Sequence, residues 1–161
     1  MRLGIDLDGV TYDFVDSVRR YLHEEHSKPL SEMTFEGDWH FYKEWGLTSE
    51  EFLWYCSRGV DEGHIFRTGN PYPGALEALR ELQHEGHQIH LITARAYGTR
   101  YIHNTADWLY EVQVPYDSLT FTVSKEIAMV DVLLDDYPPH CMEARDAGVK
   151  AALFKRPYNG Q

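Results

Sequence analysis

Two aspartates that flank a single leucine constrain the fold of this chain more than any other feature. The short apolar stretch Arg2-Leu3-Gly4-Ile5 runs directly into Asp6-Leu7-Asp8-Gly9. A short apolar run that ends in a glycine turn predicts a buried strand, and the alternative is an Asp-Gly hairpin turn. Ligands of an open α/β sheet bind at the carboxyl ends of its strands. The pattern therefore predicts that Asp6 and Asp8 stand at a functional edge of a sheet.

A pair of carboxylates this close in sequence also needs a counter-charge. Two acidic groups repel each other unless they share a cation or a proton. A hard divalent cation with oxygen ligands relieves this repulsion, and Mg²⁺ is the usual one. We therefore expect Mg²⁺ as the cofactor of this chain.

The rest of the chain alternates short apolar runs with segments of helical spacing. Strands that alternate with helices indicate right-handed βαβ units and a parallel sheet. We predict an α/β fold with a Rossmann-like parallel sheet of about five strands and flanking helices. Further strands are predicted at 88–92, 119–122, 130–134 and 149–154, and helices at 12–26, from about 48, at 73–85, 100–112 and 138–147.

The stretch 14–72 contains no good strand pattern, so it is predicted to form a small helical cap inserted after the first strand. Within it, Thr48 and Glu51 have the spacing of a capping box. The predicted domains are a core, made of 1–13 and 73–161, and this cap. On the later helix, four side chains at helical spacing are expected to face inward: Ile102, Ala106, Leu109 and Tyr110.

Polar residues follow two more of the predicted strands. Thr93 comes after the strand 88–92, and Asp135-Asp136 comes after the strand 130–134. Each has a local explanation, because Thr and Asp after a strand are often helix caps, and a single lysine such as Lys125 is usually solvated. Parallel strands end at one edge, however, so we predict that these residues meet Asp6 and Asp8.

These residues, taken in this order, resemble the four motifs of the haloacid dehalogenase-like (HAD) phosphatase superfamily, and the insertion is similar to its small cap domain. Within it, the chain is similar to the 5′(3′)-deoxyribonucleotidases. The shared features are D-x-D-G-V-x-x-D-F at 6–14, P-x-P-G-A-L-E-A at 71–78, and the spacing from Lys125 to Asp135-Asp136. One departure is Thr93-Ala94-Arg95, where the animal enzymes carry Ser-Pro after the threonine. The role of Arg95 therefore stays open.

The resemblance implies a phosphomonoesterase that works through an aspartyl-phosphate. Asp6 is the implied nucleophile, a known use of a carboxylate, and Asp8 is the implied general acid and base. Thr93, Ala94 and Lys125 are implied to hold the phosphate oxygens. Phosphoryl transfer depends mainly on positioning and charge neutralisation, which a metal and a lysine supply.

The resemblance also implies a set of metal ligands. Mg²⁺ would be held by Asp6, by the main-chain carbonyl of Asp8 and by Asp135. Asp136 would orient these ligands from outside.

Substrate selectivity is expected from the aromatic residues of 14–72. This stretch has few basic residues near its rings, which suits a flat ring and not a polyanion. Stacking of a base on an aromatic ring is worth roughly 1–3 kcal/mol. Phe14, Trp39 and Trp54 are predicted to contact the base, and Phe14 also matches the family motif. We expect nucleoside monophosphates as substrates, with the preference for deoxy forms implied by the resemblance alone.

The charge of the chain disfavours some partners. Its formal net charge is −11, which repels nucleic-acid backbones and anionic membranes. We expect a small nucleotide as partner, neither nucleic acid nor a membrane, and a homodimer stays open. The two widely separated cysteines, Cys56 and Cys141, and the absence of a leader pattern lead us to expect a cytoplasmic protein.

Two other functions stay open. One is a phosphatase of another small phosphorylated metabolite or of nucleic-acid 3′ ends, and the acidic charge disfavours the nucleic-acid version. The other is a binding module that keeps the fold without turnover. Zinc at His84, His87 and His90 is not expected, because these residues fall on a helix, a turn and a strand and share no face.

Overall fold

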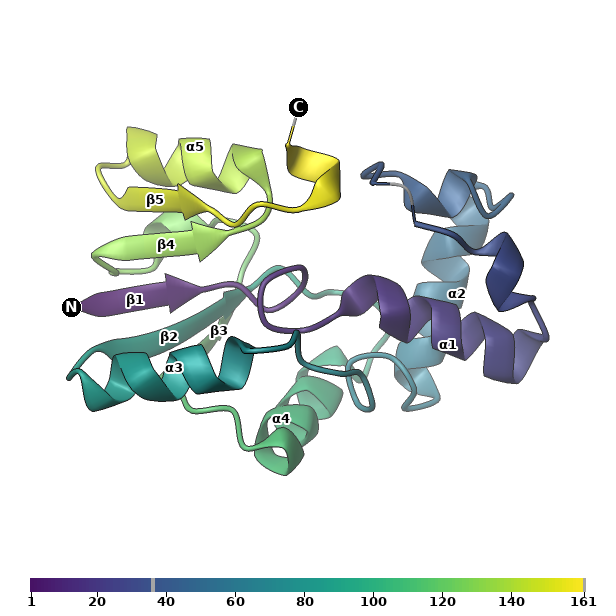
Figure 1. The fold of residues 1–161 in the computed structure, drawn as a ribbon, viewed down its shortest axis with the longest axis horizontal. Coiled ribbons are helices and arrows are strands. Elements are labelled where there is room, and N and C mark those ends of the chain that lie inside the picture. Colours follow the sequence, from purple (N-terminus) through teal and green to yellow (C-terminus); the bar gives the residue numbers. More distant parts are fainter. Residues whose placement is uncertain (36, 161) are drawn as a thin grey trace. The chain divides into compact units, whose positions relative to one another are not determined.

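A computed structural model of the protein describes residues 1–35 and 37–160. Five strands form one parallel sheet in the order β3-β2-β1-β4-β5 (Figure 1). The predicted α/β fold with a parallel sheet is confirmed. The strands are β1 (Arg2–Ile5), β2 (Gln88–Thr93), β3 (Ser118–Phe121), β4 (Val132–Asp135) and β5 (Lys150–Leu153).

β1 lies in the middle of the sheet, between β2 and β4. Leu3 pairs with Ile89 on one side and with Val132 on the other. Leu3 and Ile5 are buried, as expected for a parallel strand that is covered on both faces. The chain runs outward from β1 to β2 and β3 and then returns to β4 on the other side of β1. Ligands of open sheets bind where the strand order reverses in this way.

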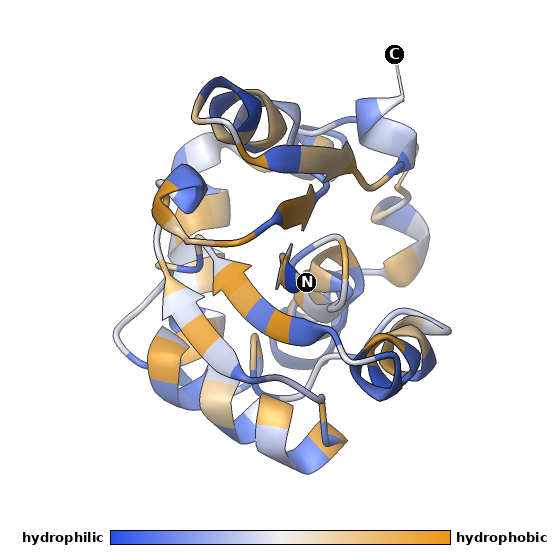
Figure 2. Ribbon diagram, turned by 90° about the vertical axis from the view of Figure 1, so that its left-hand side faces the viewer, coloured by the Kyte–Doolittle hydropathy of each residue, from blue (hydrophilic) through white to orange (hydrophobic). Residues whose placement is uncertain are grey.

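Two helices pack on this sheet. α3 (Ala75–His84) contacts β2, and α5 (Pro138–Asp146) contacts β4 and β5. α5 begins at a proline, whose fixed φ suits the first helical turn. Ile92, Leu133 and Ala144 meet in a buried cluster that joins β2, β4 and α5. In Figure 2 hydrophobic residues recur along the strands while the helices show both colours, as expected of helices with one face in the core.

The chain divides into two compact units. The first unit contains the sheet, α3 and α5 and consists of Met1–Asp13, Pro71–Arg95 and Val112–Lys155. The second consists of Phe14–Asn70, Ala96–Glu111 and Arg156–Gln161. The division into core and cap drawn from the sequence stays a prediction. None of the helices in the part of the chain that the structure describes is long and apolar enough to cross a membrane.

Helices dominate the second unit. They are α1 (Phe14–His26), α2 (Ser49–Asp61) and α4 (Tyr101–Val112), whose last residue belongs to the first unit, together with short 3-10 turns at Leu30–Glu32, Phe41–Lys43 and Pro157–Asn159. The predicted capping box at the start of α2 is confirmed. The Thr48 hydroxyl accepts from the Glu51 amide at 3.2 Å, and the Glu51 carboxylate accepts from the Thr48 amide at 2.8 Å.

The last residue of α2 caps the start of α4. Oδ1 of Asp61 accepts hydrogen bonds from the amide of Thr99 at 2.6 Å, from its hydroxyl at 2.8 Å, and from the amide of Arg100 at 3.3 Å. Gly98, at φ +64°, brings the chain so close that a Cβ there would lie 2.7 Å from the Ser57 carbonyl oxygen. Amides at a helix start have no partner inside the helix, so a carboxylate there ties the two helices together.

The buried face of α4 differs from the predicted one. Ile102 and Tyr110 are exposed, by 52% and 84%, whereas Asn104 and Trp108 are buried. The Asn104 side-chain amide donates to the carbonyl of Val60 at 2.6 Å, and the Trp108 indole donates to a loop carbonyl at 2.7 Å. Polar groups can be buried when hydrogen bonds replace water, and helical spacing of apolar residues does not reveal this.

Candidate active site

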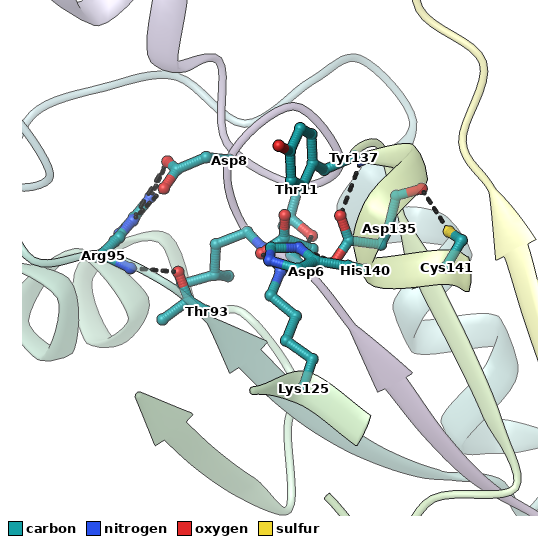
Figure 3. A network of polar contacts seen from close by, with 11 residues as sticks. Asp6, Asp8, Thr11, Thr93, Arg95, Lys125, Asp135, Tyr137, His140 and Cys141 are labelled. Atoms are coloured by element: carbon teal, nitrogen blue, oxygen red, sulfur yellow. Dashed lines mark hydrogen bonds and ion pairs between the residues drawn. The ribbon is translucent and has the colours of Figure 1, made fainter. Parts of the chain in front are cut away.

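The carboxyl ends of three neighbouring strands place polar side chains at one edge of the sheet (Figure 3). Asp6 follows β1, Thr93 ends β2, and Asp135 ends β4. All three are buried. The pairing of β1 with β4 continues to this point, because the amide of Asp6 donates to the Leu134 carbonyl at 3.0 Å. The structure thus brings together residues that the strand pattern predicted to meet.

A tight loop positions Asp8 directly after Asp6. The amides of residues 10, 11 and 12 all donate to the carbonyl oxygen of Leu7, at 3.2, 2.8 and 2.7 Å. Gly9 has a φ of +80°, which glycine adopts without steric cost. The chain therefore turns back immediately after the strand and presents the two carboxylates from a compact loop.

Lys125 links the ends of β1 and β4. Its Nζ lies 2.8 Å from Oδ1 of Asp6 and 2.6 Å from Oδ2 of Asp135. The lysine stands in the single 3-10 turn η3 (Lys125–Ile127), shortly before β4, and its side chain is only 1% exposed. Burying an ammonium group is costly without charged partners, so the two carboxylates account for its position.

Asp135 is held from several directions. Its Oδ2 accepts from Lys125 and lies 3.2 Å from Nδ1 of His140, and its Oδ1 accepts from the amide of Tyr137 at 2.9 Å. His140 is not among the site residues that the sequence pattern indicates. The available signal was its place five residues after Asp135, on a helix expected to start directly behind the strand.

Three carboxylates lie within reach of one cation. Oxygens of Asp6, Asp135 and Asp136 all lie within 4.8 Å of one another, and all three residues are buried. With Asp8, this edge carries four carboxylates, and the ion pairs described for them include Lys125 with Asp6 and Asp135 and Arg95 with Asp8. A divalent cation would neutralise the remaining formal charge, and a donor set made only of oxygen suits Mg²⁺. The residues therefore fit the expected cofactor.

The buried charges shift the protonation of their neighbours. Burial raises the pKa of Asp6 well above its usual value, and the nearby carboxylates raise it further against the opposing charge of Lys125. Burial alone would lower the pKa of Lys125, but the charges of Asp6 and Asp135 outweigh it and raise this pKa. The pKa of Asp135 is lowered despite its burial, because His140 and Lys125 hydrogen-bond to it. Of the two carboxylates that contact Lys125, Asp6 is therefore the one whose pKa is raised by its surroundings.

A second cation, Arg95, pairs with Asp8. Its Nε lies 3.2 and 3.0 Å from Oδ1 and Oδ2 of Asp8, and its Nη2 donates to Oδ1 at 2.8 Å. The Arg95 side chain is 0% exposed and that of Asp8 is 28% exposed. Figure 3 shows Asp8 pointing toward Arg95, to one side of Asp6 and Lys125. Sequence reasoning noted Arg95 as a departure from the family motif but did not predict this contact.

The expected phosphate-binding residues stand at the end of β2. Thr93 is fully buried, and its Oγ1 accepts a long hydrogen bond of 3.4 Å from the amide of Arg95. Its carbonyl accepts from the amide of Thr122 at 2.8 Å, which continues the pairing with β3. Ala94 follows and is partly exposed. Their roles toward phosphate stay predictions.

The three rings predicted to contact a base have different surroundings. Phe14 stacks on Phe66 at 5.9 Å between centroids, and on Tyr97 at 6.0 Å with an angle of only 4°. Trp39 and Trp54 are exposed and contact other rings of the second unit. Phe14 is thus part of an ordered aromatic stack that the two tryptophans do not share in the contacts described.

Comparison with known proteins identifies a nucleotidase family. The whole chain, residues 1–161, matches the family described as 5′ nucleotidase, deoxy (pyrimidine), cytosolic type C protein. A relative from Chlorobaculum tepidum, provisionally named a 5′(3′)-deoxyribonucleotidase, is 31% identical over 163 residues. The match covers 98% of this chain and 80% of the relative.

Solved structures of HAD hydrolases share the fold. A HAD-superfamily hydrolase of subfamily IA from Geobacter sulfurreducens has a TM-score of 0.64 at 15% identity, covering 97% of this chain and 87% of that one. A HAD family enzyme from Bacteroides thetaiotaomicron, solved in complex with magnesium and inorganic phosphate, has a TM-score of 0.51 at 13% identity, covering 99% and 95%. Similarity at such low identity shows the fold alone.

Proposed function

Because the chain belongs to the 5′ nucleotidase, deoxy (pyrimidine), cytosolic type C family, we propose that it is a Mg²⁺-dependent phosphatase of deoxynucleoside monophosphates. The family makes the protein a nucleotidase, and therefore a hydrolase of phosphoric monoesters. The metal, the substrate and the residue roles are the proposed part. One observation supports them most: Lys125 bridges Asp6 and Asp135 in a buried cluster that still has an excess of negative charge.

The proposed reaction has two steps. First, an Asp6 oxygen bonds to phosphorus while the bond to the ester oxygen breaks, and Asp8 gives a proton to that leaving oxygen. Next, Asp8 takes a proton from a water molecule whose oxygen bonds to phosphorus, and the bond between Asp6 and phosphorus breaks. Both carboxylates then return to their starting states, and inorganic phosphate leaves.

The phosphate is held by groups at three strand ends. We assign contacts with its non-bridging oxygens to the Thr93 hydroxyl, the Ala94 amide and the Lys125 ammonium. Mg²⁺ would be held by Asp6, the main-chain carbonyl of Asp8 and Asp135, with Asp136 orienting these ligands from outside, and would neutralise charge on the transferring group.

Phe14 is the proposed contact for the nucleobase. It follows Asp8 closely in the chain, and its stack with Phe66 and Tyr97 fixes the orientation of its ring. The rings of Trp39 and Trp54 stay weaker candidates. The partner is accordingly a small nucleotide in the cytoplasm, with neither nucleic acid nor a membrane involved, and a homodimer stays open.

A phosphate-release panel tests this proposal. We expect release from deoxynucleoside 5′- or 3′-monophosphates in Mg²⁺ and none in chelator. Phe14→Ala should raise KM for the nucleotide about 5- to 150-fold, the equivalent of one lost stacking contact, and should affect a small aryl phosphate less. Tyr110→Ala, which removes an exposed ring of the second unit, is the matched control.

Other outcomes would reject specific parts of the proposal. Equal rates on glucose 6-phosphate and on a deoxynucleotide would reject the nucleotide substrate, and a preference for an oligonucleotide with a 3′-phosphate would favour the alternative of nucleic-acid 3′ ends. Full activity in chelator would reject the metal. If the protein released phosphate from none of the esters, the result would favour the alternative of a non-catalytic binding module.

A further inference from the structure

The buried guanidinium of Arg95 calls for an explanation beyond stability. Burying a cation is costly, and a well-packed apolar side chain often serves a protein's stability equally well. The Arg95 side chain is nevertheless 0% exposed, and it forms an ion pair with the carboxylate of Asp8. An arginine at this position is therefore better explained by what it does to Asp8.

Arg95 is fixed independently of Asp8. Its guanidinium carbon lies 4.4 Å from the ring centroid of Tyr12, which is itself fully buried. Its amide donates to the Thr93 hydroxyl, so its backbone is anchored to the end of β2. A planar fork that is oriented in this way offers a carboxylate one preferred position.

The contacts to the two Asp8 oxygens are unequal. Oδ1 is approached by both Nε and Nη2, at 3.2 and 2.8 Å, whereas Oδ2 is approached by Nε alone, at 3.0 Å. Both oxygens are held, Oδ1 by two of the three hydrogen bonds described and Oδ2 by one. Oδ2 therefore keeps more lone-pair capacity for a proton.

We propose that Arg95 positions Asp8 for proton transfer, an inference that rests on the proposed function. Lys125 lies between Asp6 and Asp135 and would attract any other free carboxylate. By holding Asp8 to one side, Arg95 keeps the acid and base group apart from the nucleophile (Figure 3). Displacement at phosphorus needs this separation, because the attacking and leaving oxygens lie roughly in line on opposite sides.

The proton balance is the same as in the two proposed steps. Oδ2 of Asp8 releases its proton to the leaving ester oxygen and later regains one from the attacking water. Arg95 keeps all its protons and holds Oδ1 throughout. It is therefore a positioning residue. Its effect on kcat/KM, which reports the steps up to release of the leaving group, should appear only where that leaving group needs a proton.

Leaving-group dependence tests the inference. A deoxynucleotide releases an alkoxide that needs a proton, whereas p-nitrophenyl phosphate releases a stable phenolate. In Arg95→Ala, we expect kcat/KM for the deoxynucleotide to fall about 10- to 100-fold, within the range for general acid catalysis. For p-nitrophenyl phosphate, the fall should stay below about threefold, because proton donation contributes little there. Arg80→Ala, an exposed arginine of α3, is the matched control.

Two further variants strengthen the test. Arg95→Lys keeps the positive charge but lacks the planar guanidinium group. Its kcat/KM should therefore also fall more for the deoxynucleotide than for p-nitrophenyl phosphate, but by less than in Arg95→Ala. This variant serves as the test if Arg95→Ala does not fold. If Arg95 acts through Asp8, adding Arg95→Ala to Asp8→Asn should cause no further fall in kcat/KM for the deoxynucleotide.

Clear results would overturn the inference. Equal losses on both substrates would mean that Arg95 contacts the phosphate or supports the fold, and no loss on either would mean that Asp8 needs no help. A wild-type protein that hydrolyses neither substrate would instead refute the proposed function, so the two failures are distinguishable.

Discussion

At the scale of single residues, two buried cations divide the carboxylates of the sheet edge between them. Lys125 pairs with Asp6 and Asp135, and Arg95 pairs with Asp8. The lysine is a compact charge that two carboxylates can share, whereas the arginine is a planar fork that orients one. The choice of cation therefore matches what each carboxylate is proposed to do.

Asp6→Asn should abolish turnover, with a fall in kcat of at least about 10³-fold, because an amide cannot act as the nucleophile. Burial and the nearby carboxylates raise the pKa of Asp6, and asparagine removes one charge from this group of repelling carboxylates. We therefore expect the Tm in chelator to be unchanged or higher. Stopped assays measure kcat, and thermal unfolding measures Tm. Near-normal activity would rule out the aspartyl-phosphate.

Asp135 and Asp136 should respond differently to amide substitution. Asp135 already accepts from Lys125, His140 and the Tyr137 amide, so Asp135→Asn breaks a buried ion pair and should cost about 3–5 kcal/mol of stability. We expect Asp135→Asn also to weaken Mg²⁺ binding more than Asp136→Asn does, because the resemblance implies Asp135 as the ligand and Asp136 as a residue that orients the ligands from outside. Calorimetric titration with Mg²⁺ and chemical denaturation separate the two effects. The opposite order of Mg²⁺ affinities would make Asp136 the main ligand.

The positions of single residues could be predicted from the sequence where the residue lies at the end of a strand. Asp6, Thr93 and Asp135 could be placed at one edge because the end of a parallel strand fixes the position of its last residues. The partners of Arg95 and His140 could not be foreseen. A long side chain at a loop or on a helix can reach several places, and only the tertiary packing decides which carboxylate it meets.

At the scale of elements, the start of α4 depends on the last residue of α2. The Asp61 carboxylate accepts hydrogen bonds from the amide and hydroxyl of Thr99, and these bonds lower the pKa of Asp61 below its usual 3.8. A lowered pKa means that the folded state favours the charged form. Its stabilising effect is therefore complete above the usual pKa and is lost as pH falls through the lower value of the folded protein.

Asp61→Ala should lower the stability at neutral pH by about 1 kcal/mol, the usual worth of a capping side chain, and Asp61→Asn should lower it by less because asparagine keeps an acceptor oxygen. For a chain of this size the loss in Asp61→Ala corresponds to a Tm lower by about 2–4 °C. Asparagine resembles the protonated aspartate, so the difference from wild type should shrink as the pH falls below 3.8. Asp61→Ala is the comparison, because it removes the acceptor at every pH. A gap between wild type and Asp61→Asn that stays constant with pH would contradict the assignment.

The elements themselves were largely predictable, and their faces were less so. The predicted helices at 12–26 and 100–112 compare with α1 (Phe14–His26) and α4 (Tyr101–Val112). On α4, however, Asn104 and Trp108 are buried through hydrogen bonds to main-chain carbonyls, that of Val60 in α2 and that of Gly69 in a loop. Hydrophobic spacing cannot anticipate such partners, because they come from distant parts of the chain.

At the scale of the whole molecule, Mg²⁺ should stabilise the fold. A ligand that binds only the native state at a hundredfold excess over its Kd adds about 2.7 kcal/mol. For this chain length we expect Tm to rise by about 5–10 °C. Differential scanning calorimetry with Mg²⁺, Na⁺ or chelator measures the shift. Ca²⁺ should also raise Tm but support turnover poorly, because it accepts looser coordination. An equal Tm in Mg²⁺ and chelator would argue against the site.

The central position of β1 has a consequence for synthesis on the ribosome. Arg2 pairs with Gln88, which is 86 positions further along the chain. At a translation rate of about 5–20 residues per second, the ribosome needs roughly 4–17 s to synthesise the residues between β1 and the start of β2. During this time β1 has no partner strand in the sheet. Unpaired apolar strands invite aggregation, and adjacent charges protect against it. Asp6 and Asp8 follow this strand directly, so the carboxylates proposed for chemistry would also keep the nascent chain soluble.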